Sequence, residues 1–135
     1  MKAYSHGVMP TVLLSGCAIL KNEKILLIRK KGKEFWELPG GVVRSKLQNE
    51  QTAMEKTKEQ IGVQPEIIQH FTILEYQKAG SNIEATIFEC DVDPEATFTP
   101  GENVEEVKWF KLSELKEDSM AGKLGEDVIA ILEEV

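Results

Sequence analysis

A proline followed by two glycines marks the stretch of this sequence best suited to holding phosphate. Leu38-Pro39-Gly40-Gly41 stands where a strand-like segment runs into a polar loop. Pro39 fixes one backbone torsion, and the glycines permit conformations that other residues resist. Glycines at such a junction also let backbone amides approach a ligand closely, which suits phosphate recognition. Taken alone, the turn is explained equally well as a tight connection between a strand and a helix.

A basic run leads directly into this glycine turn. Residues 29–33, Arg-Lys-Lys-Gly-Lys, carry four positive charges in five positions. A run of this kind most often marks a solvated loop. Because this one leads through Glu34 to Phe35, Trp36 and the glycine turn, it also fits an edge that faces phosphate.

From Gly41 to Val63 the spacing resembles the Nudix box of the Nudix (MutT-like) family. That box reads Gly, five residues, Glu, seven residues, Arg-Glu, an aliphatic residue, any residue, Glu-Glu, any residue, Gly and an aliphatic residue. Gly41 opens it here and Gly62-Val63 closes it without insertion or deletion, and Glu59 takes the first place of the Glu-Glu pair. The flanking segments follow the order of motifs in Nudix domains too, so the resemblance covers about residues 11–135.

Most of the catalytic and metal-binding residue types expected inside this box are replaced by other residues. Leu47 stands where the first glutamate is expected, Glu55 where the arginine is, and Lys56 where the next glutamate is. Thr57 replaces the aliphatic residue, and Gln60 replaces the second glutamate of the pair. The spacing is that of a degenerate Nudix box, intact in length but poor in carboxylates.

The resemblance implies a reaction and a metal. Nudix enzymes cleave the diphosphate of a nucleoside diphosphate linked to another group, and box glutamates hold the Mg²⁺ or Mn²⁺ that activates water. Here Glu59 is the one expected metal ligand, and it is also a candidate catalytic residue. A single carboxylate holds Mg²⁺ poorly, because Mg²⁺ requires near-octahedral oxygen coordination. The Lys56 ammonium would also repel a cation by about 4 kcal/mol at about 4 Å if the effective dielectric is about 20.

A loop glutamate could supply some of the missing carboxylate. The family often draws an extra glutamate from a loop outside the box, and Glu102, Glu105 and Glu106 lie in the corresponding region. We therefore add Glu102 and Glu105 to Glu59 as candidate catalytic residues.

Three functions fit these residues. The first is a Nudix pyrophosphohydrolase of weak or altered activity, using Mg²⁺ or Mn²⁺ and acting on a small nucleotide or nucleoside diphosphate derivative. The second is a non-catalytic nucleotide-binding or sensor module that needs no metal, because fixed cations take its place. The third is a protein-interaction scaffold, which leaves the glycine turn and its basic neighbours without a use. The candidate phosphate-binding residues are Arg29, Gly40, Gly41, Arg44 and Lys56.

Hydrophobic periodicity predicts strands over residues 11–20, 25–28, 66–76, 83–92 and 104–110. It also predicts a box helix capped by Asn49 and stopped by Gly62, and a final helix with one apolar face. The apolar residues assigned to that face are Leu124, Val128, Ile131, Leu132 and Val135. Together with the resemblance, this order of elements predicts one α/β domain over residues 1–135, a Nudix-type α/β/α sandwich with a mixed sheet.

Helical spacing also predicts two faces for the box helix. At about 100° per residue, Ala53, Met54, Thr57 and Ile61 lie on the side that packs against the sheet. The second face carries Lys56, Glu59 and Gln60.

Composition limits the partners and the compartment. The chain has 135 residues and a net charge of −7, which argues against a general nucleic-acid binder but leaves room for a local basic pocket. No stretch approaches the roughly 18 apolar residues of a membrane span, and the N-terminus does not resemble a secretory signal. Cys17 and Cys90 lie in apolar, strand-like segments and are expected to be small buried residues in a reducing compartment. We therefore expect a cytoplasmic protein, and the sequence leaves a homodimer open.

Overall fold

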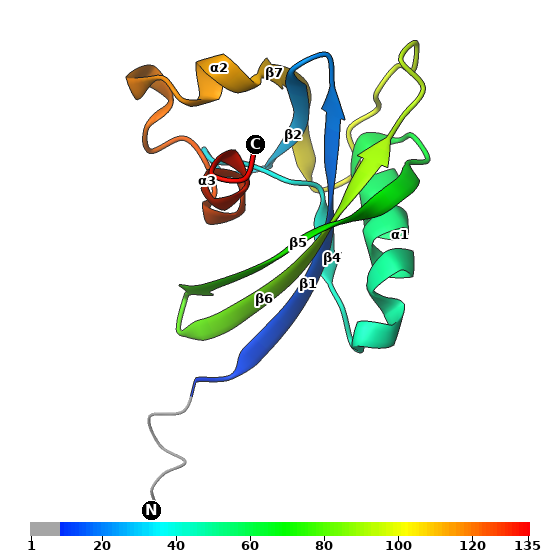
Figure 1. The fold of residues 1–135 in the computed structure, drawn as a ribbon. Helices are drawn as coiled ribbons and strands as arrows, with labels where there is room; N and C mark the ends of the chain where they lie inside the picture. Colours follow the sequence, from blue (N-terminus) through cyan, green and yellow to red (C-terminus); the bar gives the residue numbers. More distant parts are fainter. Residues whose placement is uncertain (1–8) are drawn as a thin grey trace, which may run out of the picture.

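A mixed seven-stranded sheet forms the centre of the molecule (Figure 1). The computed structural model describes residues 9–135. The sheet runs in the order β3-β2-β1-β6-β5, with β4 paired to β1 and β7 paired to β2. The strands are β1 (Thr11–Lys21), β2 (Lys24–Lys30), β3 (Trp36–Glu37), β4 (Gly40–Val42), β5 (Glu66–Lys78), β6 (Ser81–Asp91) and β7 (Val104–Lys111). The five predicted strands are confirmed, and β3 and β4 are added on either side of Pro39.

Helices cover both faces of this sheet (Figure 1). Helix α1 (Asn49–Ile61) closes one core with Cys17, Ile19 and Phe88. Helices α2 (Leu112–Leu115) and α3 (Glu126–Leu132) close the other core, which contains Trp36 and Phe110. Two short 3-10 helices, η1 (Lys46–Gln48) and η2 (Asp118–Met120), complete the structure. The predicted α/β/α sandwich with a mixed sheet is therefore confirmed.

The box helix starts near Asn49 and ends before Gly62 as predicted, but its N-terminal cap differs from the prediction. Gly62 stops α1 in the left-handed conformation, with φ of 76°, and its N–H donates to the Lys58 carbonyl. The prediction that Asn49 caps the helix was wrong, because Asn49 is its first residue and the preceding Gln48 makes no capping bond. The Asn49 amide instead donates to Thr86 Oγ1 at 3.2 Å. Ser45 supplies a side-chain cap one turn earlier, to η1, by accepting from the Leu47 N–H.

The two faces of α1 follow the predicted spacing except at Met54, which is only half-buried and lies at the edge of the face that packs on the sheet. Ala53, Thr57 and Ile61 are fully buried against the sheet. At the C-terminus the prediction needs a correction, because α3 begins only at Glu126. Leu124 is buried before the helix starts, and Val135 is 41% exposed after it ends. Among residues 9–135, no helix has the length and apolar character needed to cross a membrane.

Candidate functional site

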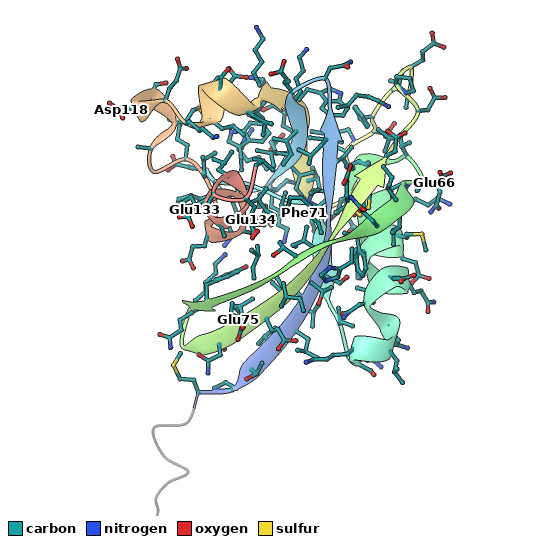
Figure 2. All side chains as sticks on the ribbon, viewed as in Figure 1. Glu66, Phe71, Glu75, Asp118, Glu133 and Glu134 are labelled. Carbon is teal, nitrogen blue, oxygen red and sulfur yellow. The ribbon has the colours of Figure 1, made fainter. Side chains whose placement is uncertain are left out.

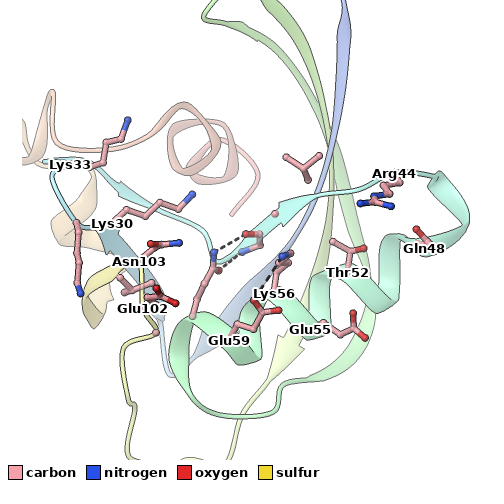
Figure 3. A pocket seen from close by; sticks show the side chains of 17 residues that line it. Lys30, Lys33, Arg44, Gln48, Thr52, Glu55, Lys56, Glu59, Glu102 and Asn103 are labelled. Atoms are coloured by element: carbon pink, nitrogen blue, oxygen red, sulfur yellow. Dashed lines mark hydrogen bonds and ion pairs between the residues drawn. The ribbon is translucent and has the colours of Figure 1, made fainter.

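The exposed face of α1 forms one wall of an open cleft of about 860 Å³. Figure 3 shows the cleft between α1, the strand carrying the glycine turn, and two loops, one after β2 and one before β7. Its lining includes Lys30, Lys31, Lys33, Gly40, Gly41, Arg44, Gln48, Thr52, Glu55, Lys56, Glu59, Gln60, Gly101, Glu102 and Asn103. The cleft thus joins the basic run, the glycine turn and the box helix predicted from the sequence.

The glycine turn is held by Gln60 from α1 and forms the floor of the cleft. The Gly40 N–H donates to Gln60 Oε1 at 2.8 Å, and Gln60 Nε2 donates to the Gly40 carbonyl at 2.9 Å (Figure 3). Gly40 has a φ of 152°, and a Cβ there would collide with the backbone of Ser15 and Gly16. Gly40 is therefore required at this position, and Gln60 serves as a two-way clamp on its peptide groups.

Lys56 lies against the second glycine. A Cβ on Gly41 would lie 2.9 Å from Lys56 Cγ, so the absence of a side chain makes room for the lysine stem. The Lys56 ammonium lies 3.8 Å from Glu59 Oε1, and both side chains are substantially exposed (Figure 3). At this distance the ion pair is loose, and the ammonium remains available to an anion in the cleft.

Further cations surround Lys56. Lys30 pairs with Glu37 at 3.0 Å, whereas Lys31, Lys33 and Arg44 have no ion-pair partner among residues 9–135. The lining holds five cationic side chains and three carboxylates, those of residues 55, 59 and 102. The cleft is therefore locally positive although the whole chain carries −7.

The acidic excess lies elsewhere on the molecule. Figure 2 shows Asp118, Glu133 and Glu134 on the side of the sheet that carries α3, away from α1. None of these three residues lines the cleft. The negative net charge of the chain consequently does not exclude an anionic ligand from this cleft.

The side chains in the cleft do not fit a Nudix magnesium site. Over the described part of the chain, residues 9–135, no group of three or more His, Cys, Asp or Glu side chains could hold a metal ion. Glu59 faces the Lys56 ammonium, and the side-chain oxygen Oε1 of Gln60 already accepts from the Gly40 N–H. Mg²⁺ needs several oxygen ligands, and a neighbouring ammonium opposes its binding.

A smaller cavity of about 130 Å³ adjoins the cleft. It shares Lys30 and the Gly40-Gly41-Val42 strand with the cleft, and its wall includes Tyr76 and Asp127. Asp127 accepts from the backbone N–H groups of Leu38 at 3.0 Å and Val128 at 2.8 Å. Burial nevertheless raises the pKa of Asp127 to about 6, and burial also raises the pKa of Tyr76. This cavity is thus apolar in part, with two polar groups that are predominantly neutral in mildly acidic solution.

Six of the eight predicted site residues line the cleft: Gly40, Gly41, Arg44, Lys56, Glu59 and Glu102. Arg29 and Glu105 are not part of its lining. The Arg29 guanidinium lies 5.7 Å from the centre of the Trp36 ring, and it also donates to the Lys33 carbonyl. Glu105 is an exposed residue of β7. The catalytic and binding roles of all eight residues remain predictions.

Sequence reasoning missed the contributions of Thr52, Gln60 and Asn103 to this cleft. Thr52 lies one helical turn before Lys56, so helical periodicity could have placed it on the same face. Gln60 is predicted on the helix face that carries Lys56 and Glu59, but its two hydrogen bonds to Gly40 are not signalled by the sequence. Asn103 carries no signal of its own, because a loop residue 43 positions beyond Gln60 can be placed only by the fold.

Comparison with known proteins identifies the same family as the spacing of the box. A family model described as NUDIX domain matches residues 13–129. The MutT NUDIX hydrolase from Burkholderia pseudomallei superposes with a TM-score of 0.78 at 23% identity, covering 93% of this chain and 98% of that one. The MutT protein from Methanosarcina mazei Go1 gives 0.76 at 17% identity and 93% of each chain. An Ap4A hydrolase from C. elegans gives 0.67 at 20% identity, with 92% and 99% covered. A comparison with curated proteins finds no match.

Proposed function

This chain belongs to the Nudix family. We propose that its cleft binds the diphosphate of a nucleotide derivative. In this proposal fixed cationic side chains hold the diphosphate, without metal and without hydrolysis. The observation that carries this proposal is the placement of Lys56. Its side chain lies against Gly41, on the cleft floor, where the family pattern has a glutamate. An ammonium at this point attracts the phosphate oxygens that a bound cation would otherwise neutralise.

The rest of the cleft supports the same assignment. Lys31, Lys33 and Arg44 add positive charge around Lys56, and the Gly41 backbone offers close approach to a ligand. An arginine binds phosphate through two parallel N–H groups, whereas lysines act as point charges that tolerate several phosphate positions. The cleft can thereby hold a diphosphate firmly without supplying an activated water.

The smaller cavity, at about 130 Å³, is the proposed place for a small group at one end of the ligand, because pockets that hold a whole drug-sized ligand measure about 300–1,000 Å³. It meets the cleft along the Gly40-Gly41-Val42 strand, so one ligand can reach both spaces. Tyr76 gives it an aromatic surface, and Asp127 gives it a polar group. Ligand pockets of this kind combine apolar walls with a few placed polar groups.

Calorimetric titration tests the role of Lys56 directly. A panel of ADP-ribose, nucleoside diphosphate sugars, dinucleoside polyphosphates and nucleoside triphosphates would be titrated in EDTA against wild type, Lys56→Ala and Lys58→Ala. Lys58 is an exposed lysine on the same helix that does not line the cleft, so it is a matched control. Losing one charge-assisted contact should weaken binding by roughly tenfold or more in Lys56→Ala and leave Lys58→Ala near wild type. Equal affinities in all three proteins would refute the proposal.

A hydrolase remains the second candidate, and one observation favours it. Glu102, from the loop before β7, lines the same cleft as Glu59 from α1 (Figure 3). Turnover of the same panel with Mg²⁺ and with Mn²⁺, measured beside Glu59→Gln, separates the two candidates. Turnover that disappears in Glu59→Gln would establish the hydrolase and displace the binding-only function.

A further inference from the structure

Two cysteines meet in the core beneath the box helix. Cys17 of β1 and Cys90 of β6 are both fully buried and both free. The strands are parallel neighbours, with Cys17 opposite Phe88 and Ile19 opposite Cys90, so the two cysteines are diagonal neighbours across the pair. The Cys90 thiol donates to Cys17 Sγ, and the two sulfur atoms are 2.9 Å apart.

We propose that Cys17 and Cys90 form a reversible disulfide that links β1 to β6 behind the cleft. A disulfide bond is about 2.05 Å long, so the sulfur atoms need to approach by only about 1 Å. Residues two positions out of register on neighbouring strands lie roughly 7–8 Å apart at Cα, slightly more than the roughly 4.4–6.8 Å that disulfides span. The bond therefore requires β1 and β6 to move toward each other locally by about 1 Å at these two residues.

The reaction balances with hydrogen peroxide as the oxidant. The Cys17 thiolate attacks one peroxide oxygen, the O–O bond breaks, and Cys17 becomes a sulfenic acid with release of hydroxide. Cys90 Sγ then attacks Cys17 Sγ, and the sulfenic oxygen leaves as water once it has taken up a proton. Two thiols and one peroxide thus give one disulfide and two waters. The Cys90 thiol hydrogen bond lowers the pKa of Cys17 and raises that of Cys90, which favours Cys17 as the first thiolate.

This bond would join residues 73 positions apart and enclose the whole box segment. It also acts directly on the floor of the cleft, because the Cys17 N–H donates to the Pro39 carbonyl at 3.0 Å. Closing a long loop lowers the entropy of the unfolded chain, so the oxidised protein should be the more stable form. Formation of this disulfide in the core does not depend on which ligand the cleft binds.

The test exposes the folded, reduced full chain to hydrogen peroxide or diamide and removes the oxidant before analysis. We expect loss of both free thiols, a monomer lighter by two hydrogen atoms, and a linked Cys17–Cys90 peptide in a non-reducing digest. The Tm should rise by roughly 10 °C and return to its starting value with a thiol reductant. The Cys17 amide should exchange hydrogen more slowly in the oxidised form.

Cys17→Ala and Cys90→Ala serve as controls. Each variant is compared with itself before and after oxidant, so its own loss of stability does not affect the result. Neither should show a rise in Tm. The proposal is overturned if the folded wild type keeps two free thiols, if the linkage joins two chains, or if the linked monomer melts no higher than the reduced one.

Discussion

Replacing Gln60 by alanine should lower the free energy of unfolding by about 2 kcal/mol. The side chain makes two hydrogen bonds to one residue, accepting from the Gly40 N–H at 2.8 Å and donating to the Gly40 carbonyl at 2.9 Å. Each bond contributes about 1 kcal/mol, and removing the partner leaves partly buried peptide groups unsatisfied. For a chain of this size the Tm should fall by roughly 8 °C, measured by denaturant and thermal unfolding.

Two further variants sharpen this prediction. Gln51→Ala removes an exposed glutamine from the same helix and should change stability by less than about 0.5 kcal/mol. Gln60→Glu keeps the side-chain length but places a carboxylate oxygen against the Gly40 carbonyl. A carboxyl group can make both bonds only when it is protonated. The loss of unfolding free energy in Gln60→Glu, relative to wild type, should therefore be larger at about pH 7 than at about pH 4. A Gln60→Ala protein as stable as Gln51→Ala would refute the clamp.

Three other predictions concern the surroundings of the cleft. Burial raises the pKa of Asp127 from 3.8 to about 6, so its contribution to stability is complete below about pH 4 and is lost as the pH rises through about 6. The unfolding free energy of wild type minus that of Asp127→Asn should therefore fall by about 2 kcal/mol between about pH 4 and about pH 7. A Cβ at Gly101 would collide with the backbone of the last turn of α1, so Gly101→Ala should lower the free energy of unfolding by about 3 kcal/mol. Gly80→Ala, in an open turn, should lower it by only about 1 kcal/mol. Chemical denaturation measures both values. Arg44→Ala should weaken ligand binding several-fold in calorimetry, whereas Arg29→Ala, outside the cleft, should not.

The sequence predicted the fold well because its strongest signals are local or tied to spacing. Five apolar runs became strands, and Gly62 ended α1 with the left-handed conformation expected of it. The fixed distance from the glycine turn to Lys56 and Glu59 also placed both residues on one cleft. A helix and a turn joined by a set number of residues constrain where their side chains can meet.

Side-chain partners were much harder to predict from the sequence. Asparagine is a typical helix-capping residue, yet the side-chain amide of Asn49 donates a hydrogen bond to Thr86 on β6 instead. Arg29 belongs to the basic run, yet the pairing of β2 with β3 and β7 places it over Trp36 and near Glu106. These outcomes depend on neighbours distant in the chain, so residue type and local spacing do not determine them. The oligomeric state and the compartment stay predictions.

The most direct test of the binding proposal is calorimetric titration of wild type with the nucleotide panel, once in EDTA and once in excess Mg²⁺. If Lys56 and its neighbours supply the charge that a metal would bring, at least one ligand should bind in EDTA. Its Kd should also be the same, within about twofold, when Mg²⁺ is present. Binding that appears only with Mg²⁺ would contradict the proposal, because the cation would then be carrying out the role assigned here to the fixed side chains.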